Sequence, residues 1–187
     1  MLAVLLLAGQ AGYGIHRLNG EEARALPGGP VVRLVQPSIR QDEKWDDQVR
    51  DRIFSTYLEM TKQAPEAGKP LPAMVIWPET AVPFLFTDRP DALAALGETL
   101  RDEQILLAGT VRQEGNRNDG ATVRYYNSVL AINGFGEITD AADKAHLVPF
   151  GEYLPMSELL GSFGLQQLVT TPGGFSAGSG RHRFKLD

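Results

Sequence analysis

Beyond Pro30, short apolar runs alternate with longer stretches that have helical spacing, and this alternation restricts the possible fold more than any other feature. Four runs rich in apolar and β-branched residues are typical of strands, at residues 31–35, 73–77, 105–111 and 125–132. Two stretches repeat apolar residues every three or four positions, as helices do, at residues 45–63 and 91–103. The order strand, helix, strand, helix, strand, strand predicts a layered α/β domain.

The second predicted strand, Ala73–Trp77, is an unbroken apolar run of the kind that is buried on both faces of a sheet. After the fourth strand, Asn133 and Gly134 give a strong turn signal. We therefore expect a hairpin that leads into a further strand near residues 137–138.

From Ala141 onward the sequence becomes irregular. Residues 144–155, KAHLVPFGEYLP, contain two prolines and one glycine and are expected to form a loop, although so apolar a loop is unusual. We expect a short helix at 157–163 and a surface loop at 172–180, which lacks the Lys-Ser/Thr ending of a phosphate-binding loop. Residues 183–186 look like the beginning of a strand, so we expect the sequence to be cut within the domain.

Composition narrows the possible chemistry. The chain has 187 residues, of which 43% are hydrophobic and 22% charged, which suits a folded globular domain. Its formal net charge of −5 argues against nucleic acid or anionic lipid headgroups as the main partner. It has no cysteine, which excludes disulfides, zinc–thiolate sites and a thiol nucleophile within these residues. Its three histidines show no metal-ligand spacing, so no metal or cofactor is expected.

The first fifteen residues, MLAVLLLAGQAGYGI, are apolar and uncharged. This run is shorter than the roughly 20 apolar residues of a membrane span, and no basic residues precede it as in a signal peptide. A polar segment and a Pro/Gly break follow, as when a membrane helix is succeeded by a soluble domain. We therefore predict the remnant of a transmembrane helix at 1–15, a linker at 16–30 and a truncated α/β domain at 31–187. An uncleaved anchor of marginal length and a buried or frayed helix are the alternatives.

Glu79 is the first candidate for chemistry, because it follows a predicted strand directly in Trp77-Pro78-Glu79. Ligands of α/β folds bind at the carboxyl ends of strands. A carboxylate held there against an apolar wall can have a raised pKa and serve as a general base. On position alone, a surface residue that caps the next turn is an equally good explanation.

Lys144, Glu152 and Trp45 are weaker candidates when each is considered alone. Lys144 begins the apolar loop, where an ammonium group can stabilise an oxyanion. Glu152 lies later in the same loop and can pair with Lys144. Trp45 opens the first predicted helix and can cover a substrate cleft. Taken singly, a solvated lysine, a solvated carboxylate and a packing tryptophan are the simpler explanations.

In combination, these segments resemble the nitrilase superfamily and, more narrowly, the apolipoprotein N-acyltransferases, bacterial membrane enzymes of lipoprotein maturation. The resemblance is carried by Val35-Gln36-Pro37 with Lys44-Trp45-Asp46, by Trp77 to Pro83, by Tyr126-Asn127-Ser128 and by Lys144 to Pro155. The last segment is the most specific, because other nitrilase relatives share the glutamate and the lysine but not this loop. The apolar N-terminus favours the membrane member over soluble amidases.

The resemblance implies an incomplete nitrilase-like αββα sandwich and a role for each candidate residue. Glu79 would be the general base that takes a thiol proton. Lys144 would stabilise the tetrahedral oxyanion, and Glu152 would assist Lys144 and the loop. The substrate site would be lined by Trp45, Phe150 and Tyr153. The nucleophile of the family is a cysteine, which we expect to lie beyond residue 187.

The resemblance also implies a reaction, in which a fatty acyl group passes from a phospholipid to the N-terminal amine of a diacylglyceryl-cysteine lipoprotein through an enzyme thioester. The partners would be phospholipid, lipoprotein and membrane, with no nucleic acid. The protein would be a monomer whose domain lies on the periplasmic side of the bacterial inner membrane. The chain alone is expected to be inactive. A fragment of a soluble nitrilase-type amidase and a non-catalytic lipoprotein-binding module are the alternatives.

Overall fold

The computed structural model describes residues 1–20, 28–40, 49–115, 122–149, 151–153 and 174–185. The chain divides into two compact units, Met1–Pro30 and Val31–Asp187. The first unit contains one helix, α1 (Leu2–Gly20), with Arg17 in its last turn, where a cation stabilises the helix dipole. Its leucine side chains are exposed. Within the described ranges, no helix combines the length and the apolar character needed to cross a membrane.

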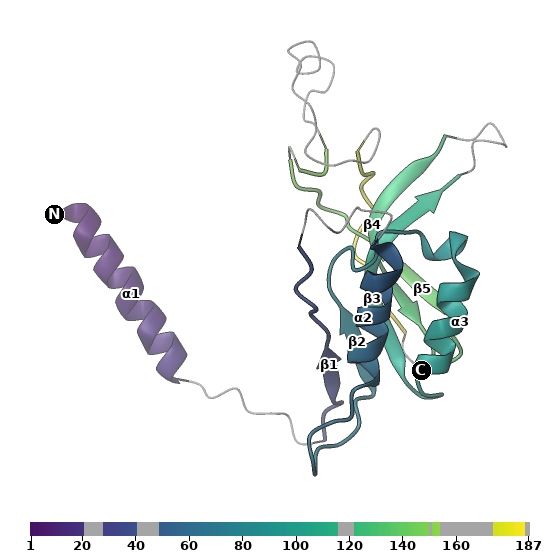
Figure 1. Cartoon of the computed structure of the whole chain (residues 1–187). Coiled ribbons are helices and arrows are strands. Elements are labelled where there is room, and N and C mark those ends of the chain that lie inside the picture. The colour runs from purple at the N-terminus through teal and green to yellow at the C-terminus, as the bar shows by residue number, and fades with distance from the viewer. Residues whose placement is uncertain (21–27, 41–48, 116–121, 150, 154–173, 186–187) are drawn as a thin grey trace. The chain divides into compact units, whose positions relative to one another are not determined.

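The second unit is built on one five-stranded sheet (Figure 1). Its strands are adjacent in space in their order along the chain: β1 (Val32–Leu34), β2 (Met74–Trp77), β3 (Ile105–Glu114), β4 (Arg124–Ile132) and β5 (Ile138–Asp143). Strands β1, β2 and β3 are parallel, whereas β4 is antiparallel to both β3 and β5. The parallel strands are joined through α2 (Arg50–Lys62), and through the short 3-10 helix η1 (Phe86–Asp88) with α3 (Pro90–Thr99). The predicted α/β class is confirmed.

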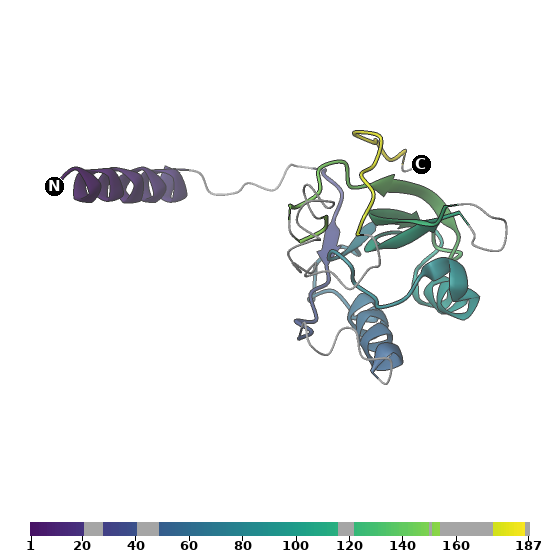
Figure 2. The same ribbon diagram turned by 90° about the horizontal axis from the view of Figure 1, so that it is seen from above.

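Helices α2 and α3 lie on the same side of the sheet (Figure 2). The buried side of α2 is formed by residues spaced as one helical face requires, Ile53, Phe54, Tyr57 and Thr61. The buried residues of α3 are Ala92 and Leu96. They pack on the alternate residues of the strands that face them, Val75, Trp77, Leu106, Ala108, Leu130 and Ile132. The described domain therefore has one helical layer on one β layer.

Trp77 ties the last residue of β2 to α2. Its ring lies 4.6 Å from that of Tyr57 and 6.2 Å from that of Phe54, measured between ring centroids. Its indole Nε1–H donates to the hydroxyl of Thr61 over 3.0 Å, so the polar edge of a buried ring is satisfied. These contacts hold the end of β2, from which the Pro78-Glu79 segment departs.

The expected turn after β4 is present, and it packs against α3. The Asn133 side-chain oxygen accepts the backbone N–H groups of Phe135 and Glu137. Gly136 has a φ of +78°, which favours glycine. A Cβ on Gly97 of α3 would lie only 2.8 Å from the carbonyl oxygen of Phe135, so glycine is needed there for the close approach.

Four sequence predictions differ from the structure. The chain was expected to become irregular from Ala141, but β5 continues to Asp143 through its pairing with β4. Helix α3 ends at Thr99 rather than near 103, because Leu100 has an extended backbone and residues 101–104 form the turn that leads into β3. Strand β2 is fully buried only on its helical side, since Met74 and Ile76 on its other side are half-buried. Residues 183–185 form no strand. The helix expected at 157–163 lies outside the described residues.

Leu96 sits at the centre of the packing between α3 and the sheet, with no exposed surface. We expect Leu96→Ala to lower the free energy of unfolding by about 2–5 kcal/mol, because it removes buried methyl groups and leaves a cavity. The exposed Leu71 provides the matched control, and Leu71→Ala should cost less than about 0.5 kcal/mol. Urea titration followed by tryptophan fluorescence measures both. Equal effects of the two variants would contradict the assigned core.

Candidate functional site

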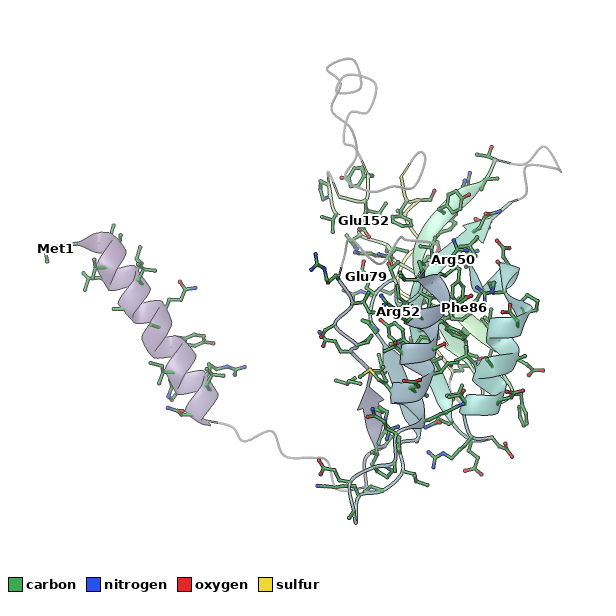
Figure 3. All side chains as sticks on the ribbon, viewed as in Figure 1. Met1, Arg50, Arg52, Glu79, Phe86 and Glu152 are labelled. Carbon is green, nitrogen blue, oxygen red and sulfur yellow. The ribbon has the colours of Figure 1, made fainter. Side chains whose placement is uncertain are left out.

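The direction of the strands brings three chemical groups to one edge of the sheet. Strands β2, β3 and β5 run in the same sense, so their carboxyl ends meet where the antiparallel β4 begins. Glu79 follows β2, Lys144 follows β5, and Asn127 lies in the first half of β4. Figure 3 shows Glu79 and Glu152 near the same end of the sheet.

Glu79 is held by a tight turn that rests on β3. Thr80 has a φ of +47°, an uncommon backbone conformation for a residue with a side chain. The N–H of Ala81 donates to the carbonyl of Gly109 over 2.8 Å. A Cβ on Gly109 would lie 2.3 Å from the carbonyl oxygen of Pro78, so the turn can sit this close only because residue 109 is glycine. The Glu79 side chain itself is 64% exposed.

Lys144 lies between two carboxylates. Its Nζ is 3.0 Å from the carboxylate of Glu152 and 3.6 Å from that of Glu79. Its backbone N–H donates to the carbonyl of Asn127, which extends the β4–β5 pairing by one residue. Burial lowers the pKa of Lys144, but the hydrogen bond to Glu152 and the charges of both glutamates outweigh it, so its pKa is raised. Lys144 is therefore a cation at neutral pH.

Glu152 is the buried member of the cluster, with 7% of its surface exposed. Its carboxylate accepts the N–H of Val148 over 2.8 Å, which closes the turn of the loop on itself. It also accepts hydrogen bonds from Asn127 over 2.7 Å and from Lys144. Burial raises the pKa of Glu152, but these three donors outweigh it, so the pKa is lowered. Glu152 is therefore a carboxylate at neutral pH.

Asn127 is a member of the cluster to which no separate role was assigned from sequence. Its side-chain Nδ2 donates to the carboxylates of both Glu79 and Glu152. The one available signal was its place in Tyr126-Asn127-Ser128, a segment that carries the resemblance. A polar residue in the buried half of a strand also requires partners, but the sequence does not show which.

A second set of contacts fixes the backbone next to Lys144. Arg112 donates to Asp143 through Nε and Nη2, over 2.9 and 2.7 Å. This pair of bonds fixes the orientation of the guanidinium plane relative to the carboxylate plane. The hydroxyl of Ser128 donates to the same carboxylate over 2.6 Å. Because Asp143 precedes Lys144 directly, β3 and β4 together fix the backbone that carries the lysine.

The segment at 174–178 closes over the same backbone. The N–H of Phe175 donates to the carbonyl of Glu152, and the N–H of Gly178 donates to the carbonyl of Lys144, each over 2.9 Å. The N–H of Ser176 donates to the carbonyl of Tyr125 over 2.7 Å. The segment therefore contacts the main chain of two of the three predicted catalytic residues.

An open cavity of about 420 Å³ adjoins this segment and the loop that follows Lys144. It is lined mainly by apolar groups, Ala145, His146, Leu147, Tyr153, Phe175 and Ala177. Tyr153, predicted to line the substrate site, is thus at its wall and is 37% exposed. The other two residues predicted for the substrate site, Trp45 and Phe150, lie outside the described residues.

The cluster has the elements of acid–base chemistry: an exposed carboxylate, a fixed cation beside it, and a second carboxylate that keeps the cation charged. In the described part of the chain, no three His, Asp or Glu side chains are grouped so that they can hold a metal ion. Fold and site together describe an α/β domain with a glutamate–lysine centre at the carboxyl ends of its strands.

The sequence is similar to proteins named apolipoprotein N-acyltransferase. One from Rhizobium leguminosarum bv. trifolii is 51% identical over 189 residues, which cover 99% of this chain and 35% of the relative. One from Brucella suis biovar 1 is 47% identical over 182 residues, which cover 97% of this chain and 34% of the relative. The resemblance predicted from sequence is confirmed: almost the whole chain corresponds to part of the apolipoprotein N-acyltransferases. The chain spans about a third of the length of these relatives.

Among solved structures, a carbon-nitrogen hydrolase from Helicobacter pylori is 13% identical, with a TM-score of 0.49 over 80% of this chain and 45% of that one. A nitrilase-superfamily amidase from Nesterenkonia is 16% identical, with a TM-score of 0.46 over 80% of this chain and 48% of that one. No protein-family model matches the chain.

The contact between Gly109 and the Glu79 turn can be tested by adding a single methyl group. We expect Gly109→Ala to lower the free energy of unfolding by about 1–3 kcal/mol and to displace Glu79, because the new Cβ would lie 2.7 Å from the Glu79 Cα. Gly151→Ala is the control, since its Cβ would meet nothing closer than 3.5 Å. Chemical denaturation and the NMR shifts of the Glu79 amide measure both effects. An unchanged Glu79 amide in the Gly109 variant would contradict the geometry.

The Arg112–Asp143 pair makes stability depend on pH. The Arg112 guanidinium holds the pKa of Asp143 below its usual range, with the Ser128 hydroxyl acting in the same direction against burial. A lowered pKa stabilises the fold above the unfolded-state value of about 3.9, and this contribution is lost as the pH falls through the folded-state value. We therefore expect Asp143→Asn to cost about 1–2 kcal/mol of unfolding free energy at neutral pH.

The difference between Asp143→Asn and the unchanged protein should be smaller at about pH 3 than at neutral pH, because below the unfolded-state pKa of about 3.9 the unfolded chain binds a proton more readily than the folded Asp143 does. Urea titrations at both pH values provide the comparison. Asp88→Asn, at the exposed end of η1, is the control. If Asp143→Asn lowered the unfolding free energy by the same amount at both pH values, the charge of Asp143 would not be the cause of the loss.

Proposed function

We propose that this chain is part of an enzyme that transfers a fatty acyl group from a phospholipid to the N-terminal amine of a diacylglyceryl-cysteine lipoprotein. The observation that carries the proposal is the position of the Lys144 ammonium between the carboxylates of Glu79 and Glu152, at the carboxyl ends of the strands. The near-complete match of the chain to proteins named apolipoprotein N-acyltransferase supports the choice of reaction.

In the first half-reaction, Glu79 takes the proton of a cysteine thiol, and the thiolate attacks the ester carbonyl of the phospholipid. The carbonyl oxygen becomes an oxyanion, which the Lys144 ammonium stabilises. When this intermediate collapses, the C–O ester bond breaks, and the departing alkoxide receives the proton from Glu79. The products are a lyso-phospholipid and an acyl thioester on the enzyme.

In the second half-reaction, the α-amine of the lipoprotein attacks the thioester carbonyl. Glu79 accepts the proton that the amine loses, and Lys144 again stabilises the oxyanion. The C–S bond breaks as the amide forms, and the thiolate regains its proton from Glu79. Throughout, Glu152 remains ionised and keeps Lys144 charged and in place.

The thiol is supplied, in this proposal, by a cysteine outside these 187 residues, because the chain contains none. The acyl and lipoprotein groups would contact the apolar loop through Tyr153, with Phe150 and Trp45 completing the substrate site. The open cavity beside Tyr153 supports an apolar ligand at this position.

A membrane location follows from the proposed substrates. Residues 1–15 would be the remnant of a transmembrane helix, residues 16–30 a linker, and residues 31–187 a nitrilase-like domain on the periplasmic side of the bacterial inner membrane. The apolar, uncharged sequence of residues 1–15 supports an apolar environment for that helix. The enzyme would act as a monomer.

The two alternatives from sequence are not favoured. The relatives with about half of their aligned residues identical carry the acyltransferase name, whereas the structures named as amidases share only 15–20% of their aligned residues. A non-catalytic binding module does not require an exposed carboxylate beside a fixed cation, whereas acyl transfer does.

The test uses a full-length N-acyltransferase in which this chain replaces the corresponding segment. We expect Glu79→Gln and Lys144→Met each to lower acyl transfer at least about 10³-fold, because each removes a group that acts in both half-reactions. Glu66→Gln is the control and should leave the rate unchanged, because Glu66 is exposed and lies in the connection between α2 and β2, at the end of β2 opposite to Glu79. Transfer is measured from phospholipid to a fluorescent lipopeptide, and the thioester by mass spectrometry.

Full activity in either site variant would overturn the proposed mechanism. The 187-residue chain by itself should show no transfer, since it lacks the thiol. Clear turnover by this chain alone would equally exclude a thioester mechanism.

A further inference from the structure

Asn127 joins the two glutamates of the cluster through one amide group. Its Nδ2 donates to Glu79 and, over 2.7 Å, to Glu152. The residue is 6% exposed, and its carbonyl accepts the backbone N–H of Lys144. A single position of β4 therefore contacts all three predicted catalytic residues, two through its side chain and one through its backbone.

The orientation of this amide is determined by its partners. Ionised carboxylates only accept hydrogen bonds, and an asparagine side chain has donors on nitrogen alone. If the amide were rotated by half a turn, its carbonyl oxygen would face two carboxylates and both hydrogen bonds would be lost. Each of the two N–H bonds of Nδ2 therefore serves a different glutamate.

The two glutamates are not equivalent around this bridge. Glu152 is buried and also accepts bonds from Val148 and Lys144, so both of its oxygens are hydrogen-bonded within the protein. The Glu79 side chain is 64% exposed, and its distance to Lys144 is longer, at 3.6 Å. A substrate can approach Glu79, whereas Glu152 is enclosed by the protein.

We propose that Asn127 is a positioning residue that gives the two carboxylates different roles. One N–H anchors the buried Glu152, which holds Lys144, and the other keeps Glu79 turned toward that lysine with its exposed side open to a reacting group. Asn127 acts through these residues and touches no substrate. Its catalytic consequence rests on the proposed function, but the bridge itself does not.

The bridge is tested first by NMR on the 187-residue chain, without any need for activity. In the unchanged chain, both Nδ2 protons of Asn127 should exchange with water at least about 10-fold more slowly than those of a solvated asparagine amide. Exchange of both protons at the rate of a free amide would overturn the proposal, and this measurement needs no variant.

The same chain then carries Asn127→Ala, which removes both donors, or Asn127→Asp, which keeps the shape of the side chain. Asn127→Ala should raise the titration midpoint of the Glu152 carboxyl carbon by about one pH unit. Asn127→Asp should raise this midpoint further, because it adds a third negative charge to the cluster. Asn133→Ala, in the turn at the other end of β4, is the control and should leave the midpoint unchanged. An unmoved midpoint in a folded Asn127 variant would overturn the proposal.

The consequence for the reaction is measured in the full-length enzyme that carries this segment. Asn127→Ala should lower kcat at least about 10-fold with a KM within about twofold, and shift the acid limb of the pH profile, whereas Asn133→Ala should do neither. If the Asn127 amide exchanges slowly but Asn127→Ala leaves kcat and the pH profile unchanged, the positioning role is contradicted and the proposed function is not. Full activity of the Lys144→Met variant would instead contradict the proposed function.

Discussion

The buried negative charge of Glu152 is the interaction on which the rest of the site depends. A carboxylate with 7% exposure is costly to enclose unless its oxygens are bonded, and here three donors bond them. The donors come from β4, from the residue after β5 and from the loop itself. Satisfying one charge therefore fixes the position of Lys144, the side chain of Asn127 and the turn at Val148. Glu79 then joins a group of atoms that is already in place.

The fold was largely predictable from sequence because its signals are periodic and local. Apolar runs of strand length and helical spacing gave the element order, and Asn133 with Gly134 gave the hairpin. Element ends were less predictable. Leu100 was expected inside α3, but it is extended, because residues 101–104 turn to enter β3 and Arg101 and Gln104 both donate to the carbonyl of Pro72. That contact is distant in the sequence, and no local pattern encodes it.

The site was predictable only in part, and for a different reason. Glu79 was singled out by its place after a strand, whereas Lys144 and Glu152 gained weight only from the resemblance. The structure brings these three side chains together, and their catalytic roles stay predictions. Asn127 and Gly109 were missed as individual residues. Their importance depends on how closely the Pro78-Glu79 turn and two carboxylates approach them in space, and the sequence shows residue types, not these approaches.

The contacts of the segment at 174–178 bear on how the cavity beside the site can change. This segment is held to Glu152 and Lys144 by main-chain hydrogen bonds from Phe175 and Gly178. Such bonds do not depend on which side chains Phe175 and Ala177 carry, and both of these side chains line the cavity. The shape and polarity of the cavity wall can therefore vary by substitution at these two positions while the backbone that carries the lysine–carboxylate cluster keeps its hydrogen bonds.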